Sequence, residues 1–232
     1  MEQSVLTTTT SSASNTDTKK RALNENSSIE TEQIPIINSN TPKEIDLSKC
    51  TLKLITKTKK HNIYRVSSDR SLKVLKTPIK SPTVQEIKNL INESKISNQL
   101  SYHGYRKSYA ITSYENKTSL LLEWADGTPL SNENCNVTSF LKIAREIVSC
   151  VKSMHDNNTC HLNISSDHIL YDSKSNGVKI IGLGKATSSS ISFCNNTSYY
   201  PKLLEKDLRY VSPEQTGRIN RHVIDYRSDF YR

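Results

Sequence analysis

Glycine is scarce in this chain: 6 of its 232 residues are glycine, well under half the usual share of about 7%. This scarcity excludes collagen-like chains, glycine linkers and phosphate-binding loops built from several glycines. Hydrophobic residues are also few, at 34%, and no apolar run approaches the ~18 residues of a transmembrane helix. The first residues lack the basic start and apolar core of a secretory signal. We therefore expect a cytoplasmic protein with no membrane span.

Cysteine is present in a pattern that excludes a disulfide framework. The five cysteines are odd in number, lie far apart and form no C-x-x-C pair: Cys50, Cys135, Cys150, Cys160 and Cys194. This spacing is typical of reduced thiols in a cytosolic protein. Cys160 and His161 are adjacent, but one Cys-His pair is too few ligands for a zinc site. The sequence therefore predicts no metal site.

Aromatic residues are missing from the first 48 positions, and this stretch is rich in Ser, Thr and Asn. It holds four basic and seven acidic residues, a net charge of −3. The rest of the chain therefore carries +12, and the two parts together give the total of +9. Such a composition cannot bury enough apolar surface to offset the entropy of ordering. We expect a disordered tail over 1–46 and a folded part over 47–232.

The basic charge of the folded part raises the possibility of a nucleic-acid or anionic-membrane partner. The charges are dispersed along the sequence, however, and no nucleic-acid motif or interleaved aromatic pattern accompanies them. We therefore expect no nucleic-acid partner.

Hydrophobic periodicity predicts strands first and helices later. Short alternating runs predict strands over 51–55, 62–66, 71–75, 108–112 and 118–124. Thr83 and Glu86 have capping-box spacing and predict the start of a helix; the strongest helical stripe covers 138–155. Two further strand-like runs cover 168–172 and 178–182. Strands ahead of a mainly helical second half indicate an α+β fold with two substructures.

The order of these elements resembles that of a protein kinase, and several short sequence motifs resemble those of the family too. Asn163 to Gly182 is 19 residues, the separation that the family's catalytic loop and hairpin require. The matching motifs are Ser71–Lys76, Leu120–Trp124, His155–Asn163, Val178–Gly184, Ser212-Pro213-Glu214 and Asp229. The resemblance implies a bilobal kinase-like fold, with an N-lobe at about 47–128 and a partial C-lobe at about 129–232.

A narrower resemblance is carried by the stretches 210–221 and 224–231. They resemble the N-terminal kinase-like domain of hybrid sensor histidine kinases, chiefly fungal ones. In that family the domain precedes a P-loop ATPase-like module, a GAF domain, the histidine kinase core and a receiver. The partners implied are these downstream modules of the same polypeptide, and signalling proteins. The alternative is an ordinary Ser/Thr kinase that shares Ser-Pro-Glu-Gln by chance.

The resemblance also shows which catalytic groups are replaced. Asn163 stands at the catalytic Asp, His168 at the metal-binding Asn and Gly182 at the metal-binding Asp. An Asn side chain cannot accept the substrate proton, and imidazole is a poor ligand for Mg²⁺. Asp167 would replace the metal Asn only after a register shift, which Ile169-Leu170 opposes. No catalytic residue is therefore intact.

Some of the other matched positions retain the family's residue type, whereas the glycines of the phosphate-binding loop are replaced. At the candidate ATP-binding positions, Lys73 matches the lysine that pairs with the phosphates and Glu93 matches the glutamate that pairs with that lysine. His161, Glu214 and Asp229 match structural positions. The three glycines of the phosphate-binding loop are replaced by Thr56, Thr58 and His61. We therefore expect ATP to bind weakly if at all, and Mg²⁺ not to bind.

The function expected from these residues is a catalytically degenerate, kinase-like regulatory module of a phosphorelay sensor histidine kinase. The alternative is a divergent, active, ATP-dependent Ser/Thr kinase. The sequence stops at Asp229-Phe230-Tyr231-Arg232, in the first turn of what would be the central helix of the C-lobe. We therefore expect a truncated fold that aggregates or is molten when expressed alone.

Overall fold

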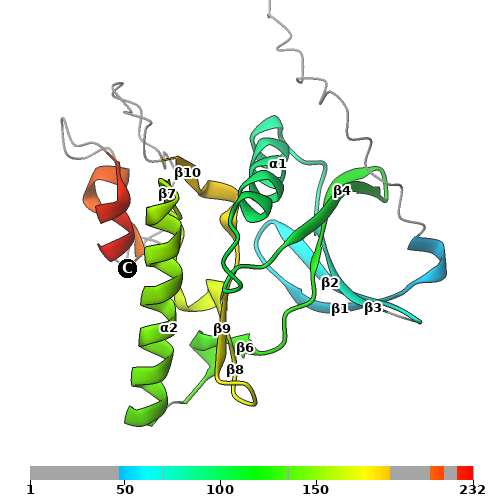
Figure 1. The fold of residues 1–232 in the computed structure, drawn as a ribbon. Coiled ribbons are helices and arrows are strands. Elements are labelled where there is room, and N and C mark those ends of the chain that lie inside the picture. Colours follow the sequence, from blue (N-terminus) through cyan, green and yellow to red (C-terminus); the bar gives the residue numbers. More distant parts are fainter. Residues whose placement is uncertain (1–46, 70, 135, 189–209, 217–223, 232) are drawn as a thin grey trace, which may run out of the picture. The chain divides into compact units, whose positions relative to one another are not determined.

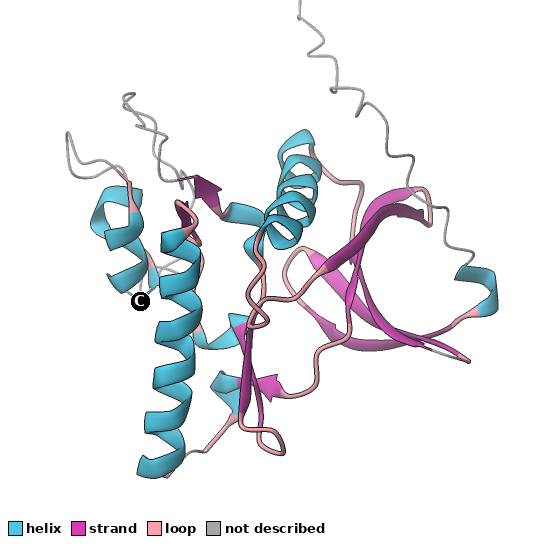
Figure 2. Cartoon of the chain, in the orientation of Figure 1, coloured by secondary structure: helices cyan, strands magenta, loops and turns pink. Residues whose placement is uncertain are grey.

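The computed structural model describes residues 47–231 except 70, 135, 189–209 and 217–223. The predicted disordered tail, Cys135, Cys194 and part of the 210–221 stretch lie outside the described residues. The described part is a mixed α and β structure with antiparallel sheets and few helices (Figure 2). None of its helices is both long and apolar enough to cross a membrane.

The largest sheet has five antiparallel strands in the order β1-β2-β3-β5-β4. Alternating apolar and polar residues place one set of side chains on each face. All five predicted strands are confirmed; four are a little longer than the predicted run, and the fifth is shifted by one residue. Their bounds are β1 (Thr51–Lys57), β2 (His61–Ser68), β3 (Ser71–Pro78), β4 (Ser108–Tyr114) and β5 (Lys117–Glu123).

Helix α1 (Val84–Gln99) begins with the predicted capping box. The Thr83 hydroxyl accepts the backbone N–H of Glu86, and the Glu86 carboxylate accepts the backbone N–H of Thr83. The helix packs on one face of the sheet, where Leu90 joins Val74 and strand β5 (Figure 1). Val66, Leu75 and Leu121 form the core of the other face with Leu47, which belongs to η1 (Leu47–Lys49).

Helix α2 (Val137–Asp156) confirms the predicted long helix, and the Asn136 side chain caps it by accepting the N–H of Ser139. Its buried side packs on the hairpin of β8 (Ile169–Asp172) and β9 (Gly177–Ile180). The apolar stripe is wider than this contact, because Ile143 is buried whereas Phe140 and Val148 are 60% and 65% exposed.

Short elements complete the described part. Strand β6 (Thr128–Pro129) pairs with β8, and β7 (Thr159–Cys160) pairs with β10 (Thr187–Ser188). Residue 168, predicted to start a strand, instead ends a 3-10 turn. The 3-10 segments are η2 (Leu130–Asn132), η3 (Ser166–His168), η4 (Leu183–Lys185), η6 (Pro213–Thr216) and η7 (Tyr226–Tyr231).

Side-chain contacts link the five-stranded sheet and α1 to the β8–β9 hairpin and η4. Lys179 on β9 forms an ion pair with Glu123 at the end of β5, at 2.7 Å. The Asn92 amide of α1 donates to the backbone carbonyls of Gly184 and Ala186. These contacts place α1 and the end of β9 around the residues that the sequence analysis singled out.

Candidate functional site

Glu93 is paired with a lysine, but the lysine is Lys76 and not the predicted Lys73. The Lys76 Nζ and Glu93 Oε2 atoms lie 2.6 Å apart. Strand parity is the reason: Lys76 shares the face of Val74, which packs against α1, whereas Lys73 shares the face of Leu75. Lys73 instead lies over the ring of Tyr109, 5.2 Å from its centroid. The alternation along β3 was a signal in the sequence that would have found the correct lysine.

The Lys76–Glu93 pair is buried, with Glu93 only 4% exposed. Burial alone would raise the pKa of Glu93, but Lys76 outweighs it and holds that pKa below its ordinary value. Arg106 lowers the same pKa through its charge. Burial in turn lowers the pKa of the Arg106 guanidinium, whose Nε has no hydrogen-bond partner among the described residues. Arg106 was missed from the sequence, because no motif marks it.

The segment matched to the catalytic loop is anchored by Asp229. Its carboxylate accepts the backbone N–H groups of His161 (2.8 Å) and Leu162 (2.7 Å) and contacts His155 Nε2 at 3.0 Å. Burial alone would raise the pKa of Asp229, but its hydrogen bonds with His155, His161 and Leu162 keep it lowered. Leu162 has a φ of 58°, a left-handed conformation that costs energy for a branched side chain. Asp229 therefore holds a strained turn in place.

His161 is fully buried and bonds to backbone groups. Its Nδ1 accepts the N–H of Asn163 at 3.2 Å, and its Nε2 lies 3.3 Å from the Ile181 carbonyl oxygen. Because a carbonyl oxygen can only accept, the proton of the neutral ring is on Nε2. These contacts are those that a structural His161 requires.

Residues of η6 and η7 support the same turn from the other side. The Gln215 amide donates to the Leu162 carbonyl oxygen at 3.2 Å, while its own oxygen accepts from Ser212. The Ser228 hydroxyl donates to Glu214 at 2.5 Å. The carboxylates of Glu214 and Asp229 thus both accept hydrogen bonds from nearby groups, and the contact of Gln215 was not foreseen.

The two positions matched to metal ligands lie against each other. Gly182 has a φ of 81°, and a Cβ atom added to it would lie 2.9 Å from His168 Cδ2. His168 is fixed by the Asn163 carbonyl oxygen, which accepts from Nδ1 at 2.8 Å. The imidazole of His168 therefore fills the space that a side chain at position 182 would need.

These residues do not fit Mg²⁺. The three positions offer the amide of Asn163, the imidazole of His168 and no side chain at Gly182, whereas Mg²⁺ prefers carboxylate oxygens. Burial lowers the pKa of His168, so its ring is neutral at pH 7. Asp167 is the nearest carboxylate in sequence, and it accepts a hydrogen bond from Ser131 at 2.6 Å. Within the described ranges, no three His, Cys, Asp or Glu side chains gather as a metal site.

The β1–β2 turn presents side chains where a phosphate-binding loop presents bare backbone. The Thr58 hydroxyl accepts the backbone N–H of His61 at 2.9 Å and closes the turn. His61 lies close enough to Lys76 and Glu93 to feel both charges, and burial with Lys76 lowers its pKa to about 4. A neutral imidazole therefore lies beside the buried ion pair.

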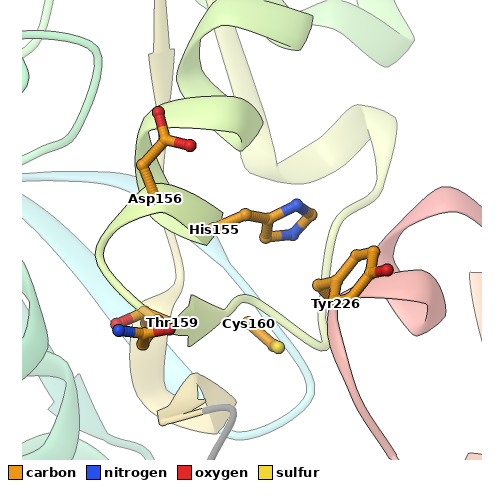
Figure 3. A pocket seen from close by; sticks show the side chains of 6 residues that line it. His155, Asp156, Thr159, Cys160 and Tyr226 are labelled. Atoms are coloured by element: carbon orange, nitrogen blue, oxygen red, sulfur yellow. The ribbon is translucent and has the colours of Figure 1, made fainter.

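A separate pocket of about 290 Å³ lies at the end of α2, beside the Asp229 anchor (Figure 3). Figure 3 shows the rings of His155 and Tyr226 across its opening, with centroids 5.7 Å apart. At its base, burial raises the pKa of the Cys160 thiol to about 12, so the thiol is protonated and unreactive. The pocket contains none of the residues matched to ATP or metal binding.

No protein-family model matches the chain. The kinase resemblance therefore depends on the residues and spacings described above. Chemically, the residues matched to the kinase site offer an ion pair with a buried glutamate, neutral imidazoles and an amide. They include no carboxylate at the positions matched to proton transfer and metal binding.

Proposed function

We propose that residues 47–232 form a catalytically degenerate, kinase-like module that acts as a regulatory or interaction part of a hybrid sensor histidine kinase. The observation that carries the proposal is the packing of His168 against Gly182. It supports a module in which the His168 ring occupies the space at the matched metal positions. The proposal includes the bilobal arrangement and the partial C-lobe.

The residues that remain of the family's pattern are those that hold the backbone. Asp229 and His161 fix the loop, and the Lys76–Glu93 pair fixes α1 against β3. Asn163, by contrast, stands where a base would be and has no proton-accepting carboxylate. A fold that keeps its supports without these groups favours a binding role. Its partners would be downstream modules of the same polypeptide and other signalling proteins.

Calorimetry with ATP, in the presence and absence of Mg²⁺, tests the proposal on the full 232-residue chain. We expect weak binding or none, with no strengthening by Mg²⁺, because the matched metal positions carry no oxygen anion. Incubation with γ-labelled ATP should leave the chain unlabelled. Tight binding that requires Mg²⁺, or label on serine or threonine, would overturn the proposal.

The second candidate is a divergent Ser/Thr kinase, and the short Lys76–Glu93 contact favours it. An ion pair at this position orients a lysine for phosphate contact in active kinases. This candidate predicts transfer of label to a general protein substrate, and the transfer should disappear in Lys76→Met. The Lys73→Met variant is the matched control, since Lys73 lies on the other face of β3. Labelling that survives in both variants would point to a contaminating kinase.

A further inference from the structure

Positive charge is concentrated in the sheet-containing half of the folded part. Residues 47–128 hold fifteen Lys and Arg against six Asp and Glu, a net charge of +9. Residues 129–232 hold thirteen against ten, a net charge of +3. The kinase resemblance does not explain this difference, because most of these lysines lie away from the matched positions.

Several of the lysines gather at strand β1 and at the adjoining end of the sheet. Lys53 and Lys57 are exposed on β1, and the Lys60 side chain is 66% exposed at the turn that follows. The exposed Lys80 comes next to this turn, because the backbone N–H of Ile79 donates to the Lys60 carbonyl oxygen at 2.9 Å. These four lysines and strand β1 are called the basic edge below.

The acidic group nearest to hand does not neutralise the basic edge. Glu86 contacts Lys60 at 3.1 Å, but the same carboxylate also accepts the N–H of Thr83 in the capping box. These hydrogen bonds hold the pKa of Glu86 below its ordinary value. Because Glu86 contacts Lys60 and Thr83, its charge does not compensate those of Lys53, Lys57 and Lys80.

Strand β1 is also an edge strand with unusual exposure. Six of its seven residues are exposed, including Leu54 at 44% and Ile55 at 49%. In the part of the chain that the structure describes, β2 pairs with one side of β1 and no strand pairs with the other. An edge strand presents a row of backbone N–H and C=O groups that an extended peptide can pair with.

We infer that the basic edge binds an extended, acidic protein segment, which adds to the sheet beside β1 and places carboxylates near the four lysines. Main-chain pairing gives affinity to a peptide only, and the carboxylates of that peptide match the charge of the edge. The edge offers lysines and aliphatic side chains, whereas single-stranded nucleic acids bind through aromatic stacking and arginine. The inference is independent of the proposed function, because it involves neither ATP nor the residues matched to metal binding.

The first experiment measures binding of a fluorescent ten-residue peptide that alternates Glu and Thr to the full 232-residue chain in 50 mM salt. We expect the anisotropy to rise and the affinity to fall about tenfold by 300 mM salt, since exposed charge pairs are screened. A peptide alternating Gln and Thr should bind about tenfold more weakly. Equal binding of both peptides would overturn the inference.

Two charge-matched variants locate the surface. The triple variant Lys53→Glu, Lys57→Glu, Lys80→Glu should weaken binding at least tenfold. The control variant Lys142→Glu, Lys152→Glu, Lys174→Glu changes the net charge equally at exposed lysines of the other half and should bind as the parent does. Circular dichroism checks that both variants fold. Equal loss in the two variants would show a response to net charge alone and would refute the site.

Main-chain pairing has its own test. A peptide N-methylated at alternate residues cannot donate those hydrogen bonds, and we expect at least a fivefold loss of affinity. Hydrogen exchange should show new protection of β1 amides when the unmodified peptide binds. Unchanged affinity and exchange would mean that the lysines guard the edge against pairing, and the inference would fail. Preference for a single-stranded oligonucleotide or for anionic vesicles over the peptide would also refute it.

Discussion

The Asp229 anchor and the matched metal positions meet at the same segment, residues 161–168, yet their chemistry differs. At the anchor, a buried carboxylate meets two backbone N–H groups and a histidine. At the metal positions, His168 lies against Gly182 with no carboxylate between them. The anchor has the polar groups that fix a strained turn. The two matched metal positions, His168 and Gly182, supply no carboxylate that could bind a metal ion. This contrast separates the parts that build the fold from the parts that would carry out a reaction.

Replacing the anchor should have the largest effect. Asp229→Ala leaves the N–H groups of His161 and Leu162 buried and unpaired, so we expect a loss of about 4 kcal/mol of stability. Urea unfolding followed by circular dichroism measures it. Asp156→Ala is the control, because that exposed carboxylate pairs with the exposed Lys152 one helical turn away, and we expect about 0.5 kcal/mol or less. Similar losses in both variants would contradict the anchor.

The two lysines of β3 offer a second comparison. Lys76→Met leaves the buried Glu93 carboxylate without its ion-pair partner, and we expect a loss of about 3 kcal/mol. Lys73→Met removes only a contact with the Tyr109 ring, at about 0.5–1 kcal/mol. Thermal and urea unfolding of the two variants should show this order. The reverse order would return Lys73 to the position that the sequence first suggested.

Restoring an acid at the metal position should not restore a metal site. Gly182→Asp forces a side chain into a φ of 81° and against His168, and we expect a loss of about 2 kcal/mol and no Mn²⁺ binding by calorimetry. The double variant with His168→Ala should recover part of the stability, because the ring no longer meets the new side chain. Independent, additive losses would show that the two positions do not touch.

The smallest effect is expected from pH. Burial lowers the pKa of His61 from 6.5 to about 4, so the unfolded chain binds more protons than the folded one between these values. Stability should therefore be complete above pH 6.5 and decline as the pH falls toward 4. Urea midpoints at pH 7, 5.5 and 4.5 measure the decline, with His61→Asn as the control that should reduce its slope. A flat profile in the parent would refute the buried, neutral ring.

Local patterns predicted much of the fold and less of the site. The alternating runs located all five strands of the large sheet, and the Thr83–Glu86 spacing located the start of α1. The kinase resemblance also marked Asp229 before any contact was known. It pointed to Lys73 and not to Lys76, however, because the motif does not indicate which face of the strand meets the helix.

The sequence alone determined the chemistry that is present: an amide at 163, an imidazole at 168 and a hydrogen atom at 182. Tertiary structure decided how these groups meet. It placed His168 in the space beside Gly182, Arg106 near Glu93 and Gln215 under Leu162. The physical reason is that periodicity and capping act between neighbours along the chain, whereas these contacts join residues far apart in sequence, whose approach depends on how whole elements pack.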